Sequence, residues 1–144
     1  METAAPATMP MRDRLVVVGF VAVTVFIWVQ RLVNIARGDE GDVGVSVALS
    51  VGLLGLGVLS GLALVMVGWA GWPATPAAAA AVWRVAAGVT VVVWVVRAVQ
   101  ITLDWRSPGF VAVHVVLALV SITLAVGLWR VAGAGTWRAR QAAH

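Results

Sequence analysis

The feature that most constrains this chain is the alternation of four long apolar stretches with short polar segments. The stretches cover residues 15–36, 43–69, 82–103 and 110–131. Each has at least the roughly 20 residues that an α-helix needs to cross the hydrocarbon core of a bilayer. A helix satisfies its backbone polar groups internally, so it is the fold that such stretches can adopt in lipid. The sequence therefore predicts an all-α, polytopic membrane protein with a four-helix transmembrane bundle.

Composition agrees with this prediction. Hydrophobic residues make up 62% of the chain and charged residues 11%, whereas soluble domains average about 45–50% and about 25%. The four stretches take up most of the 144 residues, which leaves a tail at 1–14, a connection at 70–81 and a tail at 132–144. All ten basic residues are arginines, and Ala, Val and Gly dominate the apolar positions. This bias is typical of a high-GC genome, so we expect a bacterial plasma membrane protein in contact with the lipid bilayer.

The distribution of charge predicts the orientation. The two tails and the helix ends next to them or to the middle connection carry six of the ten arginines: Arg12, Arg14, Arg84, Arg130, Arg138 and Arg140. Most acids lie in the turns at 37–42 and 104–109. Basic residues mark the cytoplasmic side of membrane proteins. Both termini and the connection at 70–81 are therefore expected in the cytoplasm, and the two hairpin turns outside.

An internal repeat is the most informative pattern. Trp28, Arg31 and Asn34 recur at one offset as Trp94, Arg97 and Gln100. The same offset pairs further residues without a gap: Val45 with Val111, Val47 with Val113, Leu53 with Leu119, and Gly61 with Gly127. A tandem copy of a two-helix unit keeps its orientation in the membrane. We therefore predict two parallel repeats of a helical hairpin, at 15–69 and 82–131, related by an axis along the membrane normal.

The repeated residues form the candidate site. Their spacing of three places the ring, the guanidinium and the carboxamide on one helix face, with each tryptophan within cation-π range of its arginine. Asp104, seven residues after Arg97, falls on the same face. We call Trp28, Arg31 and Asn34 one stripe, and Trp94, Arg97, Gln100 and Asp104 the other. If the two stripes face each other, they would form a binding site for an anionic or polar solute near the outer face. The alternative is structural, because these arginines could reach the headgroups or pair with nearby acids and lock the hairpins.

Two pairs of small residues in the second stretch predict close helix packing. Ala48 and Gly52 form a small-xxx-small pair, and Gly57 and Gly61 form a GxxxG pair. Small residues let membrane helices approach closely, and association in lipid depends on such packing. We expect a partner helix against this stretch.

His114 is the only ionisable residue deep in the fourth stretch, and at the repeat offset it pairs with Ala48. A haem ligand or proton relay is one interpretation, and a structural histidine is the favoured one. The chain has no cysteine, which excludes thiolate metal sites. Hydrolase, metalloprotease and phosphate-loop patterns are also missing. We therefore expect no enzyme activity, metal or cofactor, and the scattered arginines argue against nucleic acid.

Three functions follow from these patterns. The first is transport or a channel for an anionic or polar solute, formed by the duplicated arginine stripes in a homo-oligomer. The second is a non-catalytic accessory or scaffold subunit of a larger membrane complex, bound through the glycine face and the tryptophan-rich edges. The third is an enzyme or haem protein centred on His114.

Overall fold

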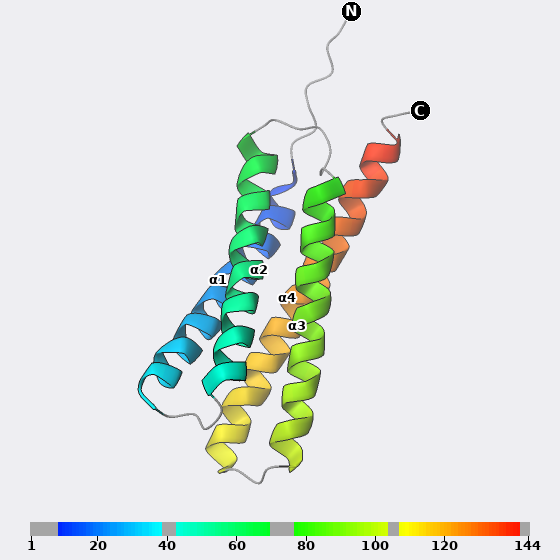
Figure 1. Ribbon diagram of the computed structural model, residues 1–144. Helices are drawn as coiled ribbons and strands as arrows, with labels where there is room; N and C mark the ends of the chain where they lie inside the picture. Colours follow the sequence, from blue (N-terminus) through cyan, green and yellow to red (C-terminus); the bar gives the residue numbers. More distant parts are fainter. Residues whose placement is uncertain (1–8, 39–42, 70–76, 104–106, 142–144) are drawn as a thin grey trace, which may run out of the picture.

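The computed structural model describes residues 9–38, 43–69, 77–103 and 107–141. They form four helices: α1 (Met11–Ala36), α2 (Val43–Trp69), α3 (Ala77–Leu103) and α4 (Pro108–Gln141). The helices run alternately up and down, so that the start of α1 and the end of α4 lie at one end of the bundle (Figure 1). All four are long and apolar enough to cross a membrane. The predicted all-α fold with four membrane-spanning helices is confirmed.

Helix α1 begins and ends with recognisable signals. Pro10 precedes its first residue, and Asp13 lies in the first turn, where an acid complements the helix dipole. At the other end the Arg37 N–H donates to the carbonyls of Val33 and Asn34. Gly38 follows with a φ of +84°, the left-handed conformation in which glycine ends a helix. The start at Met11 extends the helix beyond the apolar stretch into the polar tail.

Helix α4 is longer than the sequence predicted. Ser107 caps its start, because the Phe110 N–H donates to Ser107 Oγ at 3.4 Å and Pro108 occupies the first helical position. Residues 132–141 were predicted to belong to a tail, and this is wrong, since α4 continues through Gly133 and Gly135 to Gln141. Glycine inside a helix costs only about 1 kcal/mol relative to alanine. The good helix formers on both sides of this segment outweigh that cost.

The helices form a ring in which each contacts its two neighbours. Helix α1 packs on α2 and α4, and α3 packs on the same two helices. Helices α1 and α3 thus occupy opposite corners. Two glycines of α2 lie close to α1 in the first hairpin: a Cβ at Gly57 would lie 3.0 Å from Thr24 Cγ2, and one at Gly61 would lie 3.5 Å from Val21 Cγ1.

The core lies in the half of the bundle nearest the termini. Its buried members come from all four helices: Val17, Phe20, Val67, Ala79, Ala80, Trp83, Ala86, Ala87, Ala125, Leu128, Val131 and Ala132. The alanines of α3 flank Trp83, which is fully buried and whose indole N–H donates to the Ser60 carbonyl at 3.2 Å. Small side chains thus let the hairpins approach closely around one large ring.

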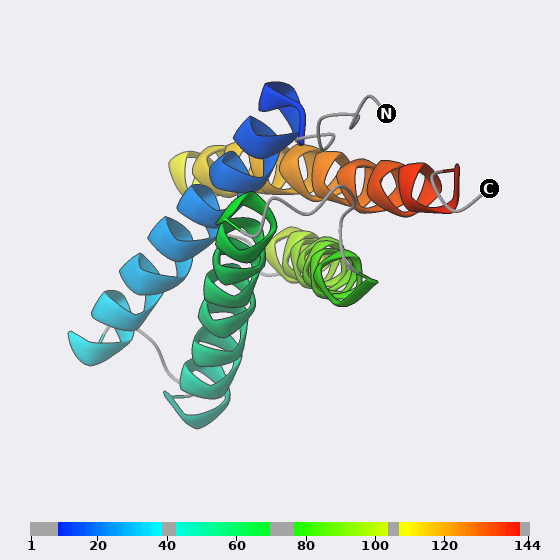
Figure 2. The ribbon, with the colours of Figure 1, turned by 90° about the horizontal axis from the view of Figure 1, so that it is seen from above.

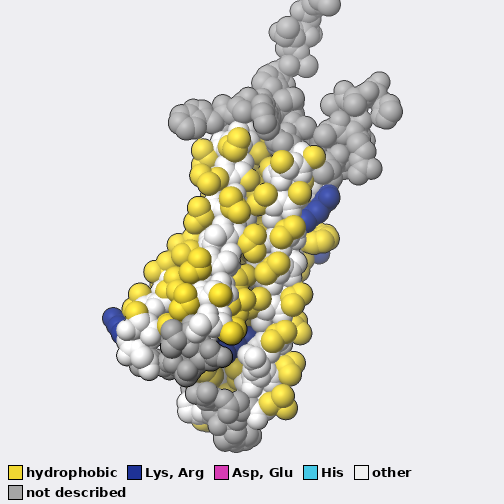
Figure 3. Space-filling view, in the orientation of Figure 1, with side chains coloured by type: hydrophobic (Ala, Val, Ile, Leu, Met, Phe, Trp, Pro, Cys, Tyr) yellow, Lys and Arg dark blue, Asp and Glu magenta, His cyan; other side chains and the backbone are white. Residues whose placement is uncertain are grey.

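Toward the two hairpin turns the hairpins diverge, as the view along the bundle shows (Figure 2). The face of the bundle seen in Figure 3 is largely apolar over the described parts of both hairpins. Large hydrophobic side chains such as Phe26, Leu103 and Leu119 are 62–83% exposed. A surface of this kind suits contact with lipid chains and agrees with an integral membrane protein.

Candidate functional site

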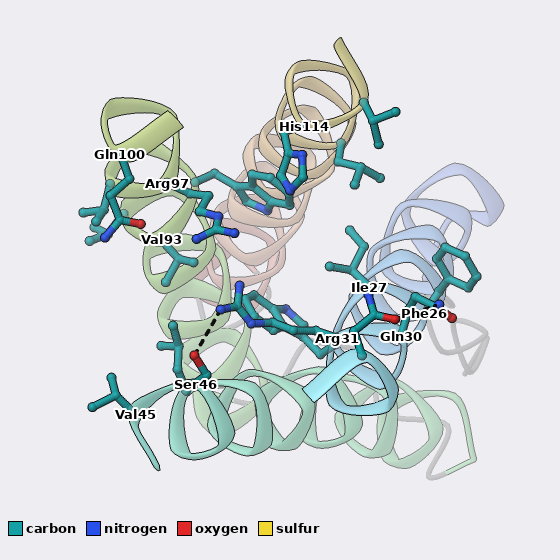
Figure 4. Close-up of a pocket in the computed structure, with 18 residues that line it drawn as sticks. Phe26, Ile27, Gln30, Arg31, Val45, Ser46, Val93, Arg97, Gln100 and His114 are labelled. Atoms are coloured by element: carbon teal, nitrogen blue, oxygen red, sulfur yellow. Dashed lines mark hydrogen bonds between the residues drawn. The ribbon is translucent and has the colours of Figure 1, made fainter. Parts of the chain in front are cut away.

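A cavity of about 580 Å³ lies between the diverging hairpins. All four helices contribute to its lining, which has eighteen residues (Figure 4). The polar members of the lining are Gln30, Arg31, Asn34, Ser46, Arg97, Gln100 and His114. Trp28 and Trp94 also line it, and the other half of the lining is aliphatic or phenylalanine. Six of the seven residues of the candidate binding site therefore meet in one cavity, and Asp104 lies outside the described residues.

Arg31 is held by contacts from two helices. Its guanidinium carbon lies 5.7 Å from the centroid of the Trp28 ring, within the range of a cation-π interaction. Its Nη2 donates to Ser46 Oγ across the hairpin at 3.4 Å. Trp28 itself is buried, with 7% of its surface exposed. The three-residue spacing of Trp28 and Arg31 thus places a cation over an immobilised ring at the cavity wall.

Arg97 enters the cavity from the opposite side. It extends from α3 toward the space into which Arg31 points from α1 (Figure 4). Trp94, one turn away, is 6% exposed, close to the value for Trp28. The carboxamides of Asn34 and Gln100 line the cavity one turn nearer the hairpin turns. Gln30 adds a third carboxamide, whose Nε2 lies 3.5 Å from Asn34 Oδ1.

His114 presents one ring nitrogen to its own helix. Its Nδ1 lies 2.8 Å from the carbonyl oxygen of Phe110, and a carbonyl only accepts, so Nδ1 carries the hydrogen. The Phe110 ring lies against the imidazole with centroids 4.0 Å apart. Nε2 is therefore the nitrogen left for a ligand, as an acceptor in the neutral ring and as a donor in the protonated ring.

Sequence reasoning missed the roles of Ser46 and His114 in this cavity. In sequence His114 pairs with Ala48, but Ala48 is exposed and Ser46 is the polar α2 residue in the lining. Along the sequence, Arg31 and Ser46 are separated from the middle of the first hairpin turn by nearly equal numbers of residues. The same is true of Arg97 and His114 and the second hairpin turn. In an antiparallel hairpin, residues equally far from the turn lie opposite each other. Applying this rule to the sequence would have paired Arg31 with Ser46 and Arg97 with His114.

The two predicted packing pairs of α2 lie in different environments. Gly57 and Gly61 face α1, at the short contacts described above. Ala48 and Gly52 are exposed, and a Cβ at Gly52 would meet nothing within 4 Å. One small-residue pair thus forms the first hairpin, and the other faces outward.

The chemistry of the cavity favours anion binding. Each guanidinium carries five N–H donors and a permanent positive charge. No acidic residue occurs among the described residues of the lining. The part of the chain that the structure describes also contains no cluster of three or more His, Asp or Glu residues that could hold a metal ion. No protein-family model, curated protein or solved structure matches the chain, so the cavity itself is the basis for assigning a function.

Proposed function

We propose that this integral membrane protein binds an anionic solute in the cavity between its hairpins and transports it. The observation that carries the proposal is the entry of Arg31 and Arg97 into one cavity from opposite corners of the bundle. Two guanidinium groups in a site with apolar walls create a strong positive potential, because the surrounding dielectric constant is low. Charge-assisted hydrogen bonds from arginine suit phosphate and carboxylate groups in particular.

We also infer that the two hairpins are copies of one unit. Burial in α1 and α3 supports this, because four pairs at the sequence offset are buried in both helices: Val17 and Trp83, Phe20 and Ala86, Thr24 and Thr90, and Trp28 and Trp94. The placement of α1 and α3 at opposite corners agrees with a two-fold axis along the bundle. A site on this axis would receive one Trp–Arg–carboxamide stripe from each copy.

The proposed site opens on the outer side of the plasma membrane. The lining residues lie toward the end of α1 and α3 and the start of α2 and α4. These helix ends are at the opposite end of the bundle from the start of α1 and the end of α4 (Figure 1). The excess of arginines at the terminal end supports a cytoplasmic location for the termini. An anion would therefore enter the site from the outer side of the membrane or be released from the site to that side.

The test is a double substitution with a charge-matched control. Arg31→Gln and Arg97→Gln remove both guanidiniums from the cavity, whereas Arg84→Gln and Arg130→Gln remove the same charge from residues outside its lining. We expect anions such as inorganic phosphate, short alkyl phosphates and carboxylates to raise the unfolding temperature of the wild type and the control. The cavity double variant should fold and lose this response. A wild type that responds to no anion, together with a double variant that does not fold, would make the arginines structural.

A second function is an accessory or scaffold role in a larger membrane complex. The outward-facing Ala48 and Gly52 favour it, because small residues on an exposed helix face allow another helix to approach closely. Purification from native membranes in mild detergent separates the two proposals. A large partner that Gly52→Leu displaces would support the scaffold role, and an isolated oligomer would support transport.

A further inference from the structure

We infer that the ligand of the cavity is an anionic amphiphile, with a phosphate or carboxylate head and an apolar chain. This inference rests on the proposed anion binding and specifies which anion the site takes. The inference is based on three observations: the size of the cavity, the position of the polar lining residues along the bundle, and the exposure of apolar lining residues on the outer surface.

The cavity is large for a small inorganic anion. At about 580 Å³ it falls within the range of about 300–1,000 Å³ that is typical of sites for drug-sized ligands. An inorganic phosphate bound at the two guanidiniums would leave much of this volume unfilled. The remaining space is bounded by apolar side chains, so an apolar body attached to the anion would fill it favourably.

The charged, carboxamide and hydroxyl side chains of the lining, with His114, all lie in the half of the cavity nearer the hairpin turns, where Val45, Val96 and Val113 also lie. The lining residues farthest from the hairpin turns are Phe26 and Ile27 on α1, Leu49 on α2, Val92 and Val93 on α3, and Leu117 on α4. All of them are apolar. The arginines, the carboxamides, Ser46 and His114 lie nearer the turns in each helix. The site thus has a cationic mouth and an apolar floor, which matches a ligand with a charged head and a chain pointing toward the bilayer centre.

Apolar lining residues on each of the four helices also reach the outer surface. Phe26 on α1 is 67% exposed and Val113 on α4 is 58% exposed. Val45 on α2 is 69% exposed and Val92 on α3 is 62% exposed. These side chains belong to the lining and to the outer surface at once, so a hydrocarbon chain can enter sideways from the bilayer.

The depth of the arginines fits the head of such a ligand. Arg31 lies five residues before the end of α1, and Arg97 lies six residues before the end of α3. With a rise of about 1.5 Å per residue, both are about 8 Å from the helix ends. Helices of this length, about 40 Å, exceed the hydrocarbon core of about 30 Å and reach the headgroups. The guanidiniums therefore lie near the boundary where lipid phosphates are found.

The experiment measures binding against chain length at a constant head group. The protein in phosphatidylcholine nanodiscs is titrated with inorganic phosphate, butyl phosphate and octyl phosphate while thermal unfolding is followed. We expect affinity to rise with chain length, by up to about fourfold for each buried methylene. The Arg31→Gln, Arg97→Gln double variant should bind octyl phosphate at least about tenfold more weakly, whereas Arg37→Gln, an exposed arginine at the same end, should bind normally.

Two wall variants separate cavity binding from partition into the disc. Val93→Phe fills part of the apolar floor and leaves the arginines intact, and Leu117→Phe does so from another helix. Either should lose the preference for octyl over butyl phosphate and retain butyl phosphate binding. Equal stabilisation by inorganic and octyl phosphate would overturn the amphiphile and leave anion binding standing. Stabilisation by no anion would overturn both, as would octyl phosphate binding that is undiminished in the double arginine variant.

A second arm distinguishes the source of the amphiphile. Nanodiscs of phosphatidylglycerol mixed with phosphatidylcholine are used, and native mass spectrometry counts the lipid that each variant retains. Retention of phosphatidylglycerol by the wild type and not by the double variant would support a membrane lipid as the occupant. Binding of octyl phosphate with no retained lipid would support the same ligand chemistry supplied from water.

Discussion

Gly57 brings α1 and α2 close together, and its replacement by alanine tests how tightly the first hairpin is packed. The new Cβ would lie 3.0 Å from Thr24 Cγ2 and 3.4 Å from Thr24 Cβ. Thr24 is buried and β-branched, so few rotamers are open to it. The two helices would have to separate by a few tenths of an ångström, which would also shift Arg31 relative to Ser46.

The magnitude follows from a comparison with Gly52 on the same helix, where a Cβ would meet nothing within 4 Å. Alanine gains about 1 kcal/mol of helix propensity at either position. Overpacking costs about 1–3 kcal/mol and applies only at Gly57. Gly52→Ala should therefore stabilise slightly, and Gly57→Ala should be neutral or destabilising. Propensity cancels between the variants, so their free energies of unfolding should differ by about 1–3 kcal/mol.

The assay is unfolding in mixed micelles with increasing sodium dodecyl sulfate, followed by circular dichroism for the wild type and both variants. Gly57→Ala should unfold at a lower detergent fraction than Gly52→Ala. If their free energies of unfolding agree within about 0.5 kcal/mol, the usual range for neutral surface changes, the close contact with Thr24 does not exist in the bilayer.

Two further predictions concern the core and the cavity. Trp83→Phe keeps most of the buried ring but loses the hydrogen bond to the Ser60 carbonyl, so the free energy of unfolding in the same assay should fall by about 1 kcal/mol; an unchanged value would mean that the bond contributes nothing. His114→Leu removes the ring nitrogen that faces the cavity and should weaken alkyl phosphate binding about two- to tenfold. His114→Gln keeps a polar group there and should bind more tightly than His114→Leu, and equal binding by both would place the imidazole outside the site.

The helices were predictable because a bilayer leaves so few alternatives for a long apolar stretch. The stripe of Trp28, Arg31 and Asn34 was also readable, since a spacing of three fixes a common face on any helix. The end of α4 was not predictable, because two glycines weaken a helix only slightly. Whether the helix continues through them depends on the helix propensities of the neighbouring residues. The local sequence thus determines which residues share a helix face, whereas it determines the end of the helix less firmly.

Partners across helices were harder to predict because they depend on where the helices cross. Ala48 and Gly52 have the same spacing as Gly57 and Gly61, yet only the second pair meets α1. Likewise, no sequence neighbour of His114 indicates that this residue lines a cavity. Its position in the cavity becomes clear only when the second hairpin is folded about its turn. Side chains that belong to one stripe are visible in the sequence, whereas those that complete the site from another helix are not.

The distribution of side-chain size explains why the bundle is closed at one end and hollow at the other. Alanines such as Ala86 and Ala87 let the hairpins pack closely at the end of the bundle where α1 begins, and the larger Trp28, Trp94 and arginine side chains line the cavity nearer the turns. Phe20, Trp83 and Leu128, each at most 2% exposed, fill the space on the terminal side of the cavity. Within the described residues the cavity therefore does not continue to that side as an open pore. Under the proposed transport function, the hairpins must separate there while they close around the arginines, and if the hairpins are repeats, as we propose, pivoting of one against the other would provide this motion.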